Sequence, residues 1–263
     1  SAASDVYKRQ MYGREMKDHN WRKGGYGMLP LAQTLWYSSN IGVSRIIDDH
    51  YRNNPEKFVK GIYRTGLQDD LKIPLVGATP ARIRMPHRNK NGQYDNCAKT
   101  SLPWMSIGYE TQVPPISTLT FYNTIANNGK MMRPRFVSKV MKNGETIMEF
   151  PPEVMRQQIA KEKSIKELQT ILEQVVSVGL GKKAGSPNFK VAGKTGTAQI
   201  SKGAGGYKSG GTSYLISFAG YFPADAPRYS CIVCIQKSGL PASGGTMCGK
   251  VFHQISEGIM AQS

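Results

Sequence analysis

Apolar residues recur at helical spacing early in the chain, and polar residues mark where the predicted helices begin and end. The segment LPLAQTLWYSSNIGVSRIIDDHY, residues 29–51, predicts two helices interrupted by the polar triplet at 38–40. Serine and asparagine side chains compete for backbone hydrogen bonds, so they are typical of a break between helices. The following segment, NPEKFVKGIYRTG, predicts another helix that Asn54 caps and Gly66 closes.

The middle of the chain contains fewer periodic segments. Residues 67–113 are rich in proline, glycine, asparagine and basic residues, and they predict long surface loops. The segment PPISTLTFYNTIANNG, residues 114–129, starts with prolines and ends at a glycine, as helices commonly do. A hairpin is predicted around the Asn-Gly pair at 143–144. The segment SIKELQTILEQVVSVG predicts a helix with one buried face and a capping box formed by Ser164 and Glu167.

Three strand-like runs occupy the last third of the chain. They are FKVAGKTGTAQI at 189–200, TSYLISFAGYF at 212–222 and RYSCIVCIQK at 228–237. Their short connections predict antiparallel pairing, with the glycine-rich segment at 203–211 as a long hairpin loop. A final helix is expected from about Lys250.

The composition suits a globular protein with a basic surface. A chain of 263 residues is long enough for one sizeable core. An excess of 35 Lys and Arg over 18 Asp and Glu gives a net charge of +17, which favours anionic partners in general. The basic residues are scattered, and neither zinc-finger spacing nor an aromatic RNA-binding motif occurs. Nucleic-acid binding is therefore not expected. Separately, no apolar run is long enough to predict a membrane span.

The cysteines and histidines do not form a recognisable metal or cofactor motif. Cys231 and Cys234 are three residues apart in a segment that reads as a strand, so their side chains are expected on opposite faces. The four histidines are isolated in the sequence, without HExxH spacing. We therefore predict neither a metal site nor a cofactor.

The segment VAGKTGTAQ, residues 191–199, contains a Lys-Thr-Gly triplet that occurs in two different kinds of site. A phosphate-binding loop requires GxxxxGK[ST], but the position five before Gly193 is Asn188, and the segment continues as a strand instead of opening a helix. A nucleotide-binding loop is therefore disfavoured. Taken alone, the triplet is also compatible with a surface lysine on a strand of small residues.

The triplet follows a second motif in the order found in serine acyltransferases that recognise penicillin. These enzymes combine S-x-x-K, S-x-N and K-[TS]-G, and the chain contains Ser38-Ser39-Asn40 and later Lys194-Thr195-Gly196. The segments YSSNIGVS, SIGYETQVPPISTLTFYNTIANNGKMMRP, VAGKTGTAQ and SFAGYFPADAPRYS extend the similarity. The chain resembles the transpeptidase domain of class B penicillin-binding proteins, most closely the FtsI-like cell-division members, over about residues 20–260.

This resemblance implies an α+β fold in which a five-stranded antiparallel sheet is flanked by helices. It also implies a reaction in which a serine attacks the penultimate D-alanine carbonyl of a peptidoglycan stem peptide, releases the terminal D-alanine and passes the acyl group to an amine. The implied ligands are peptidoglycan stem peptides and β-lactam antibiotics, and the implied partner is a glycosyltransferase of the division machinery.

The resemblance assigns roles to residues of the two motifs and to their neighbours. By this analogy Ser38 relays a proton to the leaving amine, Asn40 holds the substrate amide and the catalytic lysine, and Lys194 supplies a cation near the substrate carboxylate. Hydroxyls that bind this carboxylate are expected from Thr195 and Thr197, and the Thr197 N–H is expected in the oxyanion hole. Gly193 and Gly196 are expected to keep the strand edge bare for substrate backbone. The expected catalytic residues are Ser38, Asn40 and Lys194, the expected substrate-binding residues are Thr195, Gly196 and Thr197, and Ser38, Asn40, Lys194 and Thr197 are expected to converge.

The nucleophile motif itself does not occur, because no serine in the chain is followed three positions later by lysine. In the family this motif precedes S-x-N by roughly fifty residues. The expectation is that the nucleophile, its lysine base, the nucleophile helix, the pedestal region and the membrane anchor precede residue 1. We therefore expect an N-terminally truncated and inactive transpeptidase. A β-lactam sensor domain and a catalytically silent scaffold are the alternatives.

The first ten residues, SAASDVYKRQ, resemble translated adapter sequence at the end of an open reading frame. The expected organisation is thus non-native sequence at 1–10 and a partial transpeptidase domain at 11–263. For the full-length protein, the resemblance implies an anchor in the inner membrane and a catalytic domain in the periplasm.

Overall fold

The computed structural model describes residues 8–200 and 212–263. Within them, the central antiparallel sheet has the order β11-β10-β9, with bounds Ala192–Ile200 for β9, Ser213–Phe222 for β10 and Tyr229–Ser238 for β11. The pairing of β10 with both neighbours is regular along its length. The predicted strand runs and their antiparallel pairing are therefore confirmed, whereas the predicted loop at 203–211 lies outside the described residues.

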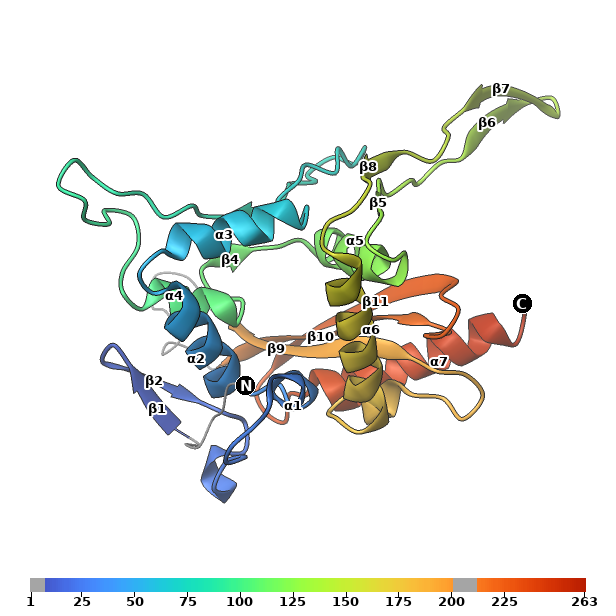
Figure 1. Cartoon of the computed structure of the whole chain (residues 1–263). Helices are drawn as coiled ribbons and strands as arrows, with labels where there is room; N and C mark the ends of the chain where they lie inside the picture. The colour runs from blue at the N-terminus through green and yellow to red at the C-terminus, as the bar shows by residue number, and fades with distance from the viewer. Residues whose placement is uncertain (1–7, 201–211) are drawn as a thin grey trace.

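Helices cover both faces of this sheet (Figure 1). Helices α5 (Pro115–Ala126) and α6 (Glu162–Ser177) form one hydrophobic cluster with Tyr221 of β10 and Ala192 of β9. On β10 the alternate residues Ile216 and Phe218 belong to a second cluster with Phe252 of α7 (Gly249–Met260). Because successive side chains of a strand point to opposite faces, β10 supplies both cores. The fold is α+β, with the sheet between helical layers.

The described part of the chain provides three strands for this sheet instead of the expected five. The number five came from the family resemblance, whereas the hydrophobic pattern itself contains only three long strand-like runs. The remaining strands pair separately in four two-stranded sheets, so they do not extend the central sheet: β1 (Lys8–Met11) with β2 (Arg14–Lys17), β3 (Arg82–Ile83) with β4 (Thr111–Gln112), β5 (Met131–Met132) with β8 (Val154–Arg156), and β6 (Lys139–Lys142) with β7 (Glu145–Glu149). The five-stranded sheet is not confirmed.

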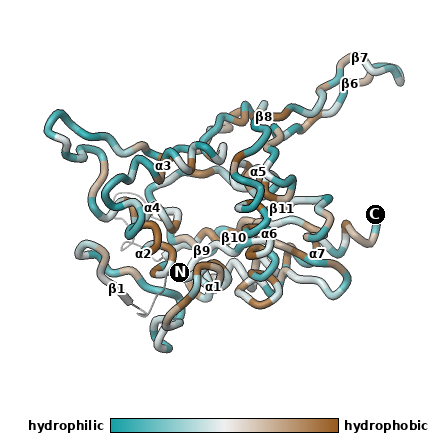
Figure 2. The backbone as a smooth tube through the Cα atoms, viewed as in Figure 1, coloured by the Kyte–Doolittle hydropathy of each residue, from teal (hydrophilic) through white to brown (hydrophobic). Residues whose placement is uncertain are grey.

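A second, mostly helical lobe lies beside the sheet (Figure 1). It contains η1 (Trp21–Lys23), α1 (Leu31–Trp36), α2 (Asn40–Tyr51), α3 (Pro55–Arg64) and α4 (Ser101–Ser106). Figure 2 shows hydrophobic residues gathered on α1 and α2, and a hydrophilic long loop between α3 and α4. The predicted helix break at 38–40 and the Asn54 cap of α3 are confirmed. The short helix α4 was missed, because six residues are too few to show a period.

The hairpin of β6 and β7 turns where the sequence predicts it and extends away from the body of the molecule (Figure 1). Asn143 and Gly144 both have positive φ, +50° and +83°, as this type of turn requires. The capping box of α6 is wrong, because the helix begins at Glu162 with Lys161 at the cap position. Its buried face is as predicted, and the chain then passes through η2 (Lys182–Ala184) to β9.

A buried carboxylate fixes the start of α2. The side chain of Asp18 accepts hydrogen bonds from the Ser39 hydroxyl at 2.7 Å and from the Ile41 N–H at 3.1 Å. Asp18 and Ser39 are each about 1% exposed. The first N–H groups of a helix lack partners within the helix and form its positive end, so a carboxylate stabilises this position. Ser39 also caps the Gly42 N–H at 3.0 Å.

Glycine at position 193 is required by packing inside the sheet. A Cβ at Gly193 would lie 2.6 Å from both the Ala219 carbonyl oxygen and the Phe218 ring. A backbone oxygen and a buried ring cannot yield this space cheaply. The bare strand is thus explained at Gly193 by its own neighbours, independently of any substrate.

Replacing Asp18 by alanine is expected to lower the free energy of unfolding by about 2 kcal/mol, because two buried donors lose a charged acceptor. Chemical denaturation monitored by circular dichroism measures this change. The control is Asp49→Ala on α2, the helix that Asp18 caps. Asp49 forms exposed ion pairs at 3.8 and 3.9 Å, which predict a change in the free energy of unfolding within about 0.5 kcal/mol. Equal effects of both variants would contradict the capping role.

Gly193→Ala is expected to destabilise the fold by about 1–3 kcal/mol, because the added methyl group overpacks β9 against β10. Gly258→Ala is the matched control, since a Cβ at this exposed position of α7 meets nothing within 4 Å. Alanine at 258 should instead stabilise the protein by about 0.5–1 kcal/mol. Thermal denaturation of both variants tests whether their stabilities change in opposite directions. A Gly193→Ala protein as stable as the wild type would refute the packing argument.

Candidate active site

Ser38 lies at the sharp turn between α1 and α2. Its φ of +50° is unusual for a residue with a side chain. Such a backbone conformation costs of order 1–3 kcal/mol and persists only where the surroundings impose it. Here Ser39 donates its N–H to the Thr34 carbonyl at 2.9 Å, and Asp18 holds the helix that follows.

Trp36, at the end of α1, connects this turn to helix α6. The Trp36 indole donates to the Gln174 side chain at 3.1 Å, and the Leu180 N–H donates to the Trp36 carbonyl at 3.0 Å. Both bonds join α1 to the part of the chain that comes before β9 in the sequence: Gln174 lies in α6, and Leu180 lies between α6 and β9. They place Ser38 against the strand that carries the Lys-Thr-Gly motif.

The two motifs meet in the structure. The Lys194 ammonium donates a hydrogen bond to the Ser38 hydroxyl, although 156 positions separate the residues. The same ammonium lies 3.2 Å from the Thr195 carbonyl oxygen and 3.4 Å from the Thr195 hydroxyl. Ser38 and Thr195 hydroxyls are 3.3 Å apart. Burial lowers the pKa of Lys194 from its usual value to about 8.

The other expected residues lie on the same elements but make different contacts. Asn40 is the first residue of α2, and its amide donates to the Lys17 carbonyl at 3.2 Å. The hydroxyl of the exposed Thr197 accepts from the Gly244 N–H at 3.4 Å, at the start of the π-helical turn η4 (Gly244–Cys248). Gly196 lies between the two threonines on β9. The structure thus joins Ser38, Lys194 and Thr195 directly, whereas neither Asn40 nor Thr197 is hydrogen bonded to Lys194.

An aromatic group beside this cluster was not found by sequence analysis. The rings of Tyr26 and Tyr37 stack with centroids 4.9 Å apart, and the Tyr26 hydroxyl lies 2.7 Å from Nε2 of His19. Burial raises the pKa of Tyr26 to about 12 and lowers the pKa of His19, which the Asp18 charge raises and the Lys194 charge lowers further. No motif marks these residues. Only the adjacency of Tyr37 to Ser38 and of His19 to Asp18 links them to the site in sequence.

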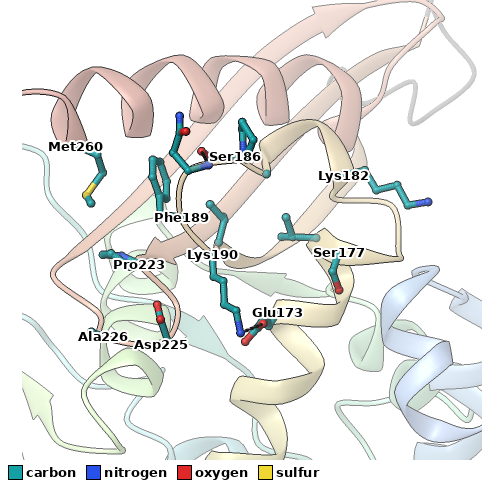
Figure 3. A pocket seen from close by; sticks show the side chains of 15 residues that line it. Glu173, Ser177, Lys182, Ser186, Phe189, Lys190, Pro223, Asp225, Ala226 and Met260 are labelled. Carbon is teal, nitrogen blue, oxygen red and sulfur yellow. Dashed lines mark hydrogen bonds and ion pairs between the residues drawn. The ribbon is translucent and has the colours of Figure 1, made fainter.

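A cavity of about 850 Å³ lies elsewhere, between α6, the 185–191 segment and Met260 of α7. Figure 3 shows Lys190 reaching toward Glu173 across this cavity, at a distance of 3.3 Å between charged atoms. Neither Ser38 nor Lys194 lines it. The cavity is therefore separate from the site that the two motifs form.

Comparisons with known proteins show the family of the chain. Residues 3–257 match the family described as penicillin binding protein transpeptidase domain. The chain is 27% identical to the penicillin-binding protein PbpB of Mycolicibacterium smegmatis over 248 residues, covering 89% of this chain and 36% of that protein. It is 27% identical to the peptidoglycan D,D-transpeptidase FtsI of Escherichia coli, covering 94% of this chain and 38% of that protein. The chain thus spans about a third of the length of these curated relatives.

Solved structures are similar in fold. Penicillin binding protein 3 from Mycobacterium tuberculosis aligns with a TM-score of 0.78 at 23% identity, over 100% of this chain and 57% of that chain. A peptidoglycan glycosyltransferase from Burkholderia ambifaria aligns with a TM-score of 0.72 at 25% identity, over 99% and 71% of the two chains. With both motifs joined in one site and a family match over nearly its whole length, the chain belongs to the transpeptidase family of penicillin-binding proteins.

Proposed function

We propose that this chain is part of a class B peptidoglycan D,D-transpeptidase and carries two of the three motifs of its active site. The observation that supports this most strongly is the hydrogen bond from Lys194 to Ser38. A structural lysine on an exposed strand would project into water, whereas this ammonium lies half-buried among oxygen atoms. Burying a cation is costly unless it has polar partners. The arrangement suits binding of a negatively charged group.

The names of related proteins support the same substrate class. A relative from Escherichia coli is named peptidoglycan D,D-transpeptidase FtsI, and solved structures of the Mycobacterium tuberculosis protein are described as complexes with ampicillin and aztreonam. We propose that peptidoglycan stem peptides are the substrates of the full-length protein and that β-lactams are its inhibitors. We also propose a membrane anchor, a periplasmic catalytic domain and a glycosyltransferase partner for the full-length protein.

In the proposed reaction, a serine hydroxyl adds to the penultimate D-alanine carbonyl and loses its proton to a base. The tetrahedral intermediate collapses, the terminal D-alanine leaves with a proton, and an acyl-serine remains. An amine from a neighbouring strand then attacks this ester, forms the peptide cross-link and regenerates the serine. The reaction needs no redox step, and no metal or cofactor is proposed.

Each motif residue has a proposed task in these steps. Ser38 passes a proton to the leaving amine, and the neighbouring Lys194 ammonium supplies that hydroxyl with a proton donor. Thr195 and Thr197 donate hydroxyl hydrogen bonds to the terminal carboxylate, while Gly196 leaves the strand edge open. The N–H of Thr197 stabilises the oxyanion. Asn40 holds the substrate amide, and its bond to the Lys17 carbonyl uses one N–H, which leaves the second N–H and the amide oxygen for the substrate.

The nucleophile is proposed to lie in an S-x-x-K segment that precedes residue 1, since no such segment occurs in the chain. By the family analogy Ser38 occupies the proton-relay position, with its oxygen aimed at the leaving group rather than at the carbonyl, and it contacts Lys194 and Thr195 of the other motif. Loss of a covalent nucleophile removes several orders of magnitude in rate in other enzymes, and binding groups do not restore the covalent step. The 263-residue chain is therefore proposed to be inactive.

The 263-residue chain is expected not to be labelled by a fluorescent penicillin, because it lacks the S-x-x-K segment that supplies both the nucleophile and its base. Gel fluorescence and mass spectrometry measure this. A longer protein that includes the upstream S-x-x-K segment should be labelled, and Lys194→Ala in that longer protein should abolish most of the labelling. Stoichiometric labelling of any serine in the present chain would place the nucleophile inside it and overturn the assignment.

Noncovalent binding of an N-acetylated peptide ending in D-alanyl-D-alanine is expected to weaken about tenfold between pH 7 and pH 9. A lysine with a pKa of about 8 is mostly charged at the lower pH and mostly neutral at the higher pH, so its attraction to the carboxylate is lost. NMR titration measures the affinity. In Lys194→Arg, whose side chain stays charged, the profile should be flat; an equally flat wild-type profile would contradict a lowered lysine pKa.

A further inference from the structure

Strand β9 forms one edge of the central sheet in the part of the chain that the structure describes. Its pairing with β10 runs without a register shift from Ala192 to Ile200. In an antiparallel pair, the backbone N–H and C=O groups of alternate residues point toward the partner strand or away from it. Gln199 donates its N–H away from β10, to the Tyr109 hydroxyl. By alternation, Thr197 and Thr195 also direct their backbone groups to the open edge.

Thr195, Thr197 and Gln199 differ in whether their outward backbone groups are already hydrogen bonded. The Gln199 N–H binds the Tyr109 hydroxyl at 3.3 Å, and the Thr195 carbonyl accepts from the Lys194 ammonium at 3.2 Å. Within residues 8–200 and 212–263, the Thr197 N–H has no hydrogen-bond partner. The open part of the edge thus lies between the catalytic lysine and a tyrosine that is 90 positions away from Gln199 in sequence.

Tyr109 is held in place by an unusual backbone. It lies between Gly108 with φ of +98° and Glu110 with φ of +59°. The Tyr109 N–H donates to the Trp104 carbonyl at 3.0 Å, which ties the turn to the end of α4. On the other side, Glu110 forms an ion pair with Arg84 at 3.1 Å. Of Gly108 and Glu110, only Glu110 has an unusual φ for a residue with a side chain, and such a conformation persists where the surrounding structure holds it.

Given the proposed function, we propose that Tyr109 ends the peptide-binding edge of β9. A peptide that pairs with this edge as an added strand hydrogen bonds to Thr197. The next outward N–H, at Gln199, is already bonded to Tyr109. Substrate residues further from the reacting D-alanyl-D-alanine end therefore gain no strand pairing with β9. Tyr109 acts as a positioning residue, and it limits main-chain recognition of the stem peptide to its last residues.

The test is a series of N-acetylated peptides that end in D-alanyl-D-alanine and grow by one residue at the amino end. Binding to the 263-residue chain is measured by NMR titration. In the wild type, affinity should stop rising after the residue that pairs with Thr197. In Tyr109→Phe the Gln199 N–H is free to bind the next residue of the peptide. Adding that residue should then raise the affinity about two- to tenfold, which is the range of one hydrogen bond.

Tyr94→Phe is the matched control. It also removes a tyrosine hydroxyl, which donates to Glu56 at 2.7 Å, but it lies on the loop between α3 and α4 and not at β9. Its peptide series should equal that of the wild type. A series for Tyr109→Phe that equals the wild type would overturn the inference, as would a wild-type affinity that continues to rise with length.

Hydrogen exchange of the Gln199 amide provides a second readout that needs no peptide. This amide should exchange slowly in the wild type and about tenfold faster or more in Tyr109→Phe. An unprotected Gln199 amide in the wild type would overturn the inference even if the variant fails to fold. If no peptide binds any of the proteins while Gln199 is protected, the proposed function fails, and the inferred limit on substrate fails with it.

Discussion

The contact between the Lys194 ammonium and the Ser38 hydroxyl is the interaction on which the rest of the site depends. It joins the edge strand of the sheet to the turn between two helices, and it determines which surfaces of the two lobes face each other. A cation at this depth needs oxygen atoms around it. Ser38 and Thr195 provide these oxygen atoms, and the bonds of the lysine to them fix the distance between β9 and the start of α2.

The surroundings of this contact are built to keep both partners in place. Asp18 anchors the first turn of α2, and Trp36 fastens α1 to α6 through the Gln174 side chain. On the sheet side, Gly193 allows β9 to lie close to Phe218 of β10. The positive φ at Ser38 occurs between these packed elements, and packed surroundings are what holds such a conformation in place. Stability elsewhere in the chain therefore maintains a strained geometry at the site.

The chemistry of the site differs from that of the surface as a whole. The net charge of +17 comes from basic residues distributed along the chain, and most of those that the structure describes are exposed. Lys194 is different because burial lowers its pKa to about 8, so it is close to titration near neutral pH. This property comes from desolvation by residues that are distant in sequence. The overall charge does not predict it.

Several parts of the fold are encoded by residues that are close together in the sequence. The break at Ser38, the Asn54 cap, the Asn143-Gly144 turn and the three long strands were predicted, because each depends on neighbouring residues or on a short period. The cap of α6 was placed at Ser164, three residues after the observed cap position at Lys161. The number of strands in the sheet was inferred from the family, and the described chain did not confirm it.

The sequence by itself determined the family, through the order and spacing of Ser38-Ser39-Asn40 and Lys194-Thr195-Gly196, because these motifs are short and chemically specific. Only the tertiary structure decided that Asp18 caps α2, that Asn40 binds the Lys17 carbonyl, and that Tyr109 meets Gln199. Such bonds join residues between 23 and 90 positions apart. Their formation depends on how the helices pack against the sheet, and no local pattern of residues records that packing.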